Sequence, residues 1–119
     1  MIRKYFSRFR FALKGLSTAL ISDFGFRSQI YLGVLVAFLL GAFLLPLAQT
    51  EILFVSVAYA LVLITELQNS ALEAALDKLH PERHDAIGKS KDLAAGAVLL
   101  AGLVLLLVIL TIVFDRFLT

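Results

Sequence analysis

The chain has 119 residues, and 61% of them are hydrophobic, against roughly 45–50% in ordinary soluble domains. This composition argues against a water-soluble globule and indicates a small membrane protein. The absence of cysteine excludes disulfides and thiolate metal sites. The net charge is only +2, but basic residues crowd the first 27 positions, where Asp23 alone opposes them. This distribution is more typical of a segment bound to a membrane surface than of a nucleic-acid-binding segment.

Residues 1–28 are predicted to form an amphipathic surface helix. Their apolar side chains recur at steps of four and three, which places them on one side of a helix: Ile2, Phe6, Phe9, Leu13, Leu16 and Leu20. Basic residues interrupt the apolar ones as far as Lys14, a pattern that does not fit a cleavable signal peptide. We therefore expect this helix to remain in the mature protein and to lie flat in the membrane interface.

Three apolar stretches follow, at residues 30–47, 52–64 and 93–114. The first and third approach or exceed the roughly 20 residues that a helix needs to cross a bilayer. The middle stretch covers only ~20 Å as a helix, so the polar residues from Thr65 onward must complete its crossing. The sequence thus predicts an all-α membrane protein with one domain over 1–119 and membrane helices at 30–47, 52–77 and 93–114.

The basic residues also predict the orientation of the chain. Lys and Arg are frequent before the first span and in the loop predicted from Lys78 to Lys91, whereas the turn at residues 48–51 has none. By the positive-inside rule, the N-terminus and the second loop are cytoplasmic and the C-terminus lies outside. Pro46 is predicted to close the first span and Pro81 to begin the second loop.

Small residues recur at four-residue spacing within two of the predicted spans. They are Gly33, Ala37 and Gly41 in the first span, and Ala97 and Ala101 in the third. Such spacing allows helix backbones to approach closely. Glycine and alanine are also simply common in membrane helices, so both interpretations stay open at this point.

A polar stripe follows the second apolar stretch, and it consists of Glu66, Asn69, Ser70, Glu73 and Asp77. At roughly 100° per residue these side chains share a sector about 100° wide on one helix face, and Glu66 and Glu73 lie ~10 Å apart along the axis. Carboxylates inside a membrane are costly and usually serve a function, which favours a functional role for Glu66 and Asn69. Glu73 and Asp77 are also compatible with a solvated helix end.

The stripe, together with Lys91 further along the chain, has the side chains that phosphoryl transfer requires. Glu66 is suited to take the proton of an attacking hydroxyl, and Lys91 to neutralise phosphate oxygens. Glu73 is suited to bind Mg²⁺, whose shell combines a few carboxylates with phosphate and water. Gly88–Ser90 lacks the earlier glycine of a phosphate-binding loop, and Pro81 separates His80 from His84, which argues against a zinc pair on a helix.

Three segments resemble a known family. They are ELQNSALEAALD at Glu66–Asp77, PERH at Pro81–His84, and KD at Lys91–Asp92 followed by an Ala/Gly-rich span. Together they resemble the small integral-membrane prokaryotic diacylglycerol kinases and their undecaprenol kinase relatives, from about Phe11 to the third span. The resemblance implies an ATP- and Mg²⁺-dependent lipid kinase of the bacterial inner membrane, assembled as a homotrimer with sites between subunits.

The resemblance also implies roles for individual residues. Glu66 would be the catalytic base, Asn69 and Ser70 would orient substrate and phosphate, and Asp23 and Glu73 would bind the metal. The residues implied at the ATP site are Lys4, Phe11, Glu82, Arg83, His84, Lys91 and Asp92. The residues implied at the lipid site are Lys14, Gly15, Leu20 and Arg27, within a segment that starts at Phe11.

Some positions depart from the family pattern, and others match only one of its two branches. Family members usually have Glu where this chain has Asp23, and Tyr is common in the diacylglycerol branch where this chain has Phe11. The residues around Phe26, Arg27 and Gln29 look more like the diacylglycerol branch, whereas DLAAGAVLL after Lys91 looks more like undecaprenol kinases. We expect phosphorylation of diacylglycerol to phosphatidic acid; the alternatives are undecaprenol as substrate, or a non-enzymatic channel or scaffold oligomer.

Overall fold

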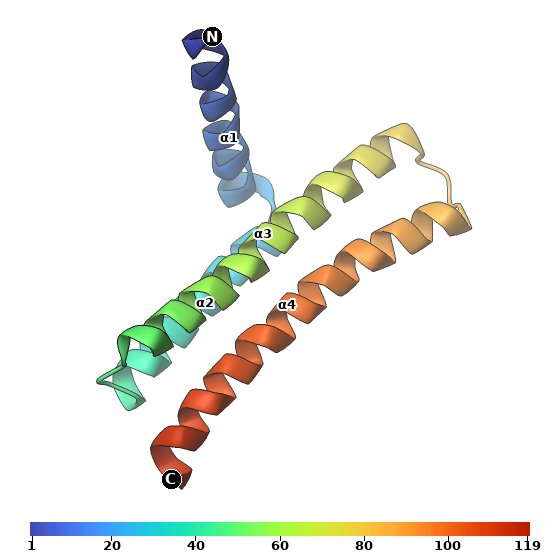
Figure 1. Cartoon of the computed structure of the whole chain (residues 1–119). Coiled ribbons are helices and arrows are strands. Elements are labelled where there is room, and N and C mark those ends of the chain that lie inside the picture. Colours follow the sequence, from blue (N-terminus) through green and yellow to red (C-terminus); the bar gives the residue numbers. More distant parts are fainter.

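The computed structural model describes residues 1–119 and is entirely helical (Figure 1). Its four helices are α1 (Ile2–Ser22), α2 (Phe24–Phe43), α3 (Gln49–Leu79) and α4 (Asp85–Leu118). The last three are long and apolar enough to cross a membrane. The predicted all-α membrane fold, with an N-terminal helix before three crossing helices, is confirmed.

The helix bounds differ from the predicted segments: α2 ends at Phe43, before the predicted end at residue 47, whereas α3 and α4 extend beyond their predicted bounds. Residues 24–28 belong to α2 and not to the N-terminal helix, which ends at Ser22. The predicted extent of the loop, from Lys78 to Lys91, is wrong, because only residues 80–84 lie outside the helices. Pro81 lies in this short turn, where its missing N–H removes no helical hydrogen bond. The charged residues after it are compatible with a helix. His84 caps α4, since its Nδ1 accepts a hydrogen bond from the Ala86 N–H at 3.1 Å.

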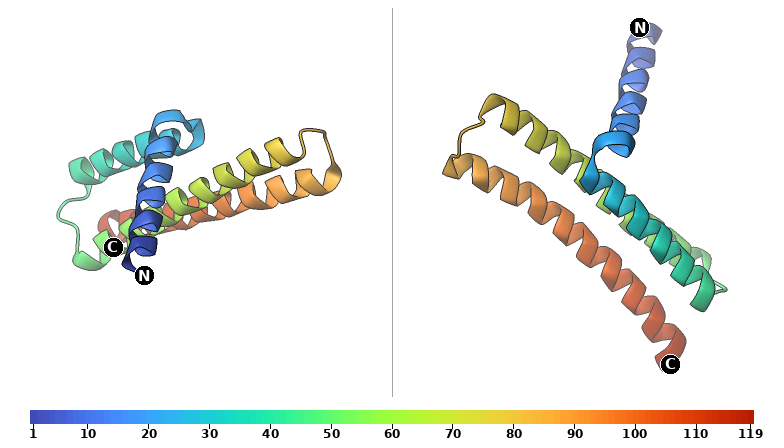
Figure 2. Two further views of the ribbon diagram at one scale, coloured as in Figure 1. Left: turned by 90° about the horizontal axis from the view of Figure 1, so that it is seen from above. Right: turned by 180° about the vertical axis from the view of Figure 1, so that it is seen from behind.

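Asp23 separates α1 from α2. Its backbone is extended, and its Oδ1 accepts a hydrogen bond from the Gly25 N–H at 3.2 Å, as is common for an aspartate that caps a helix. Beyond this junction α1 projects away from the other three helices (Figures 1 and 2), and Ala19 is its only buried residue. The apolar side of α1 is therefore free to contact a membrane.

The helices α3 and α4 run antiparallel and side by side (Figures 1 and 2). Ala58 and Val62 of α3 pack against Ala101 and Leu105 of α4, and a second cluster joins Leu40, Leu44 and Ile112. Only 10 of the 119 residues are buried, so most large apolar side chains remain exposed. Continuous apolar surface of this extent is expected to face lipid or other protein chains.

Two of the five small residues in the predicted spans make close contacts, and three, among them the exposed Ala37, do not. Ala101 is buried between α3 and α4, and Gly33 lies against the ring of Tyr59, where an added Cβ would be 2.7 Å from Cε2. The Tyr59 hydroxyl donates to the Gln29 carbonyl at 3.0 Å, which ties α3 to α2. Gly41 has nothing within 4 Å of an added Cβ, and Ala97 is exposed. The packing interpretation therefore holds for Gly33 and Ala101 within this chain.

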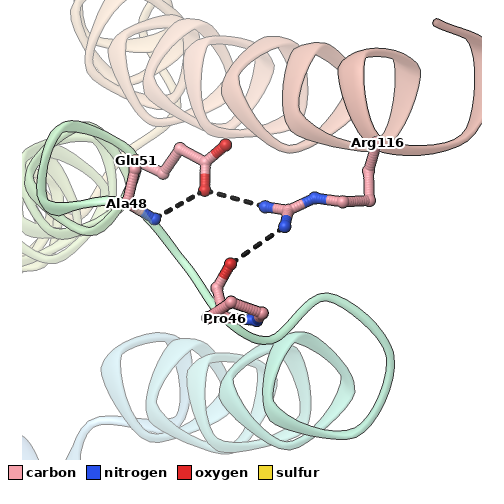
Figure 3. A network of polar contacts seen from close by, with 4 residues as sticks. All are labelled: Pro46, Ala48, Glu51 and Arg116. Atoms are coloured by element: carbon pink, nitrogen blue, oxygen red, sulfur yellow. Dashed lines mark hydrogen bonds and ion pairs between the residues drawn. The ribbon is translucent and has the colours of Figure 1, made fainter.

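A polar cluster joins the C-terminal end of α4 to the α2–α3 loop (Figure 3). Arg116 donates one hydrogen bond to the Pro46 carbonyl and one to Glu51 Oε2, both at 2.9 Å. The same Glu51 oxygen accepts the Ala48 N–H at 2.9 Å, at the start of α3. Glu51 thus connects the first turn of α3 to α4, and the cluster fixes the α2–α3 loop.

We expect Arg116→Gln to lower the free energy of unfolding by about 1–2 kcal/mol, because hydrogen bonds to charged groups are worth about 1.5–3 kcal/mol and this pair is only partly shielded from solvent. Unfolding of the purified protein in micelles by a denaturing detergent measures this change. The double variant with Glu51→Gln should lose less than the sum of the two single changes. Full additivity would show that the two side chains do not interact.

Candidate functional site

Glu66 is the only charged residue that the fold buries, with 8% of its surface exposed. Its carboxylate lies against Gly25 in the first turn of α2, and its Cδ is 3.2 Å from the position that a Cβ on Gly25 would take. A larger residue at position 25 would overlap the carboxylate. Glycine at this position thus allows Glu66 to rest where α2 begins.

Asp23 lies beside the same glycine. Its Oδ1 is 3.7 Å from the position of that added Cβ, so two carboxylates flank Gly25. Asp23 Oδ2 and Asn69 Oδ1 are both buried without a hydrogen-bond partner. Buried oxygens without partners are rare, and carboxylate and amide oxygens suit Mg²⁺. The donor set here fits such an ion, although a single chain brings no three acidic or histidine side chains close enough to form a complete metal site.

An open groove of about 970 Å³ lies between α1 and α3, next to Asp23. Among the residues that line it are Phe11, Lys14, Gly15, Asp23 and Ser70. The predicted lipid-site residues Lys14 and Gly15 therefore share one cavity with a predicted metal ligand. Leu20 and Arg27 do not line it. Leu20 is exposed, and the Arg27 guanidinium donates to the Ile21 carbonyl at 3.5 Å and to the Tyr31 hydroxyl at 3.4 Å.

Burial decreases steadily along the polar stripe. Glu66 is buried, Asn69 and Ser70 are partly buried, and Glu73 and Asp77 are exposed. Since α2 begins opposite Glu66, the rest of α3 extends ~20 Å past the start of α2. The stripe thus runs from the packed part of the bundle to its projecting end, as expected for a row of groups that crosses from lipid to water.

The residues implied at an ATP site are dispersed in the single chain. Lys4 is exposed near the free end of α1, and Glu82, Arg83 and His84 are exposed in or beside the α3–α4 turn. Asp92 is exposed on α4, whereas Lys91 donates a hydrogen bond to Asp77 of α3. Of this set only Phe11 lines the groove.

Two features of the site were not predicted from the sequence. One is the approach of Gly25 to Glu66, and the other is the ion pair between Lys91 and Asp77. Each joins residues on different helices, so no local spacing in the sequence signals it. The only available signal was indirect, namely a glycine two residues after Asp23, at the start of an apolar stretch.

The chain is similar to known proteins over most of its length. The model of the family described as prokaryotic diacylglycerol kinase matches residues 10–114. A protein of Escherichia coli K12 named diacylglycerol kinase is 37% identical over 91 residues, which are 76% of this chain and 73% of that protein. A Haemophilus influenzae protein of the same name is 32% identical over 92 residues, 77% of this chain and 76% of that protein. A Synechocystis protein, again with this name, is 37% identical over 101 residues, 84% of this chain and 57% of that protein. The chain therefore belongs to the prokaryotic diacylglycerol kinase family.

Proposed function

We propose that this membrane protein is a diacylglycerol kinase, which transfers the γ-phosphoryl group of ATP to the hydroxyl of diacylglycerol and forms phosphatidic acid. The observation that carries the proposal is the family match over residues 10–114, in a chain whose buried Glu66 lies beside Gly25, as does Asp23, which lines an open groove. The names of the relatives favour diacylglycerol over undecaprenol. A channel is disfavoured because the stripe occupies one end of α3 instead of its whole length.

Glu66 would act as the general base. As the lipid oxygen bonds to the γ-phosphorus and the bond from phosphorus to the ADP oxygen breaks, the Glu66 carboxylate takes the hydroxyl proton. The exposed end of the stripe offers a route by which this proton reaches water. Asn69 and Ser70, one turn further along α3, would orient the hydroxyl and the phosphate, and the groove containing Lys14 and Gly15 would hold the lipid.

Asp23 and Glu73 would hold Mg²⁺ together with the phosphates of ATP. When bound, the ion neutralises charge on the phosphate oxygens. The buried Asp23 Oδ2 without a partner supports this role. The other oxygen, Asp23 Oδ1, accepts the Gly25 N–H that caps α2. One carboxylate can therefore both fix the α1–α2 junction and bind the metal.

The implied ATP-binding residues would meet in a homotrimer. Because one chain leaves Lys91, Asp92 and the α3–α4 turn apart from Asp23 and Glu66, we infer that copies complete each other's sites. We place the protein in the bacterial cytoplasmic membrane with its N-terminus on the cytoplasmic side. The Lys and Arg residues of α1 and of residues 78–91, against none at residues 48–51, support this orientation.

The activity can be tested with purified protein in mixed micelles, Mg²⁺ and ATP labelled on its γ-phosphate. We expect labelled phosphatidic acid with diacylglycerol, and little transfer to undecaprenol supplied at equal concentration. Preferential labelling of undecaprenol would reassign the substrate. Failure of a correctly assembled protein to label any lipid alcohol would reject the lipid kinase proposal.

Glu73→Gln should raise the Mg²⁺ concentration needed for half-maximal activity by roughly ten- to hundredfold, because an amide is a neutral and weaker ligand than a carboxylate. A titration of activity with Mg²⁺ at saturating ATP measures this shift. Asp115→Asn is the matched control, since it removes one carboxylate at the other end of the bundle. An unchanged Mg²⁺ requirement in Glu73→Gln would remove Glu73 from the metal site.

A further inference from the structure

Asp77 and Lys91 form the only ion pair at the projecting end of the α3–α4 hairpin. Lys91 Nζ donates to Asp77 Oδ1, and this contact bridges the last turns of α3 and the first turns of α4. The lysine side chain is 35% exposed and the aspartate side chain 66% exposed. The pair therefore lies at a surface that water and a soluble nucleotide can reach.

An ion pair this exposed contributes little to the stability of the fold. Its larger effect is to restrict where the Lys91 side chain points. A lysine carries its charge on a flexible stem with several rotatable bonds. Asp77 restricts that stem by accepting one of the three ammonium N–H groups, and two remain for other acceptors. Asp77 also belongs to the polar stripe, one turn beyond Glu73 on the same face of α3. The ammonium is thus held at the level of the exposed end of the stripe.

We propose that Asp77 is a positioning residue, which holds the Lys91 ammonium ready to bind a phosphate oxygen of ATP. This inference rests on the proposed kinase function and extends it to a residue that need not touch nucleotide or metal. An ion pair between a phosphate-binding lysine and a carboxylate serves the same purpose in other phosphoryl-transfer enzymes. Loss of the carboxylate leaves the lysine charge intact but lets the stem sample many directions.

The test compares Asp77→Asn with the wild-type protein in the micelle assay. We expect the KM for ATP to rise about fivefold while kcat changes little, because the lost pairing energy is that of an exposed ion pair. Asp77→Glu should restore most of the KM, since a longer carboxylate at this exposed position can still reach Lys91. Asp85→Asn, which removes another exposed carboxylate at the same end of the bundle, should leave the KM unchanged.

Binding of a non-hydrolysable Mg·ATP analogue, measured by calorimetry, provides a second readout that does not depend on turnover. Weaker binding in Asp77→Asn but not in Asp85→Asn supports the positioning role. An unchanged KM and unchanged binding would overturn it, and so would a shift in Mg²⁺ requirement, which would make Asp77 a metal ligand. If the wild-type protein binds the analogue but phosphorylates no lipid, the proposed function fails, while the comparison of the variants still decides the role of Asp77.

Discussion

Glu66→Gln is expected to lower kcat by about 10²- to 10⁴-fold, the usual contribution of a general base. The amide has nearly the same shape as the carboxylate and can occupy the same place beside Gly25, but it cannot take a proton. Binding of Mg·ATP should be retained, because other side chains are proposed to hold the nucleotide and its ion. Steady-state phosphorylation of diacylglycerol, together with calorimetric nucleotide binding, separates the two effects.

Glu51→Gln is the matched control for this prediction. It removes a carboxylate from the opposite end of the same helix, where Glu51 pairs with Arg116 and not with any proposed site residue. It should reduce stability and leave kcat unchanged. Wild-type kcat in Glu66→Gln would remove the base assignment.

Co-assembly of two inactive chains tests whether the site is shared between copies. Chains with Glu66→Gln and chains with Lys91→Met should each be inactive alone. Their mixture should regain part of the activity. A site formed between two different chains can then combine the intact Glu66 of one copy with the intact Lys91 of the next. Absence of any recovery in well-mixed assemblies would place both residues of a site in one chain.

Gly33→Val is expected to destabilise the packing of α2 on α3 by about 2–4 kcal/mol. The added Cβ would overlap the ring of Tyr59, and overpacking typically costs about 1–3 kcal/mol. Moving the ring also breaks the hydrogen bond from the Tyr59 hydroxyl to the Gln29 carbonyl, worth about 1 kcal/mol. Unfolding by a denaturing detergent in micelles measures the loss.

A double-mutant cycle makes this prediction specific to the contact. Tyr59→Val removes the ring, so the variant with both changes should recover most of the stability that Gly33→Val loses. Gly41→Val is the control on the same helix, because nothing lies within 4 Å of its added Cβ. Equal losses for Gly33→Val and Gly41→Val would show that the ring contact is not the cause.

The predicted fold followed from a strong physical constraint. In a bilayer every backbone N–H and C=O group must be satisfied within the protein, so long apolar segments have to be helical. The ends of the helices were predicted less well, as the region from Asp85 to Lys91 illustrates. It was expected as a loop because it is charged, yet lysine is a good helix former, and Asp85 in the first turn of α4 interacts favourably with the helix dipole. The proline that stops the preceding helix lies earlier, at Pro81.

The sequence by itself determined the helical character of the chain and the polar stripe on α3, because both depend on periodicity along one segment. The tertiary structure decided which side chains meet across helices: Glu66 with Gly25, Tyr59 with Gly33, and Lys91 with Asp77. Such contacts depend on the relative shift and rotation of packed helices. The shift and rotation are set by the shapes of all the side chains between the helices, so they cannot be predicted from a pattern within one segment.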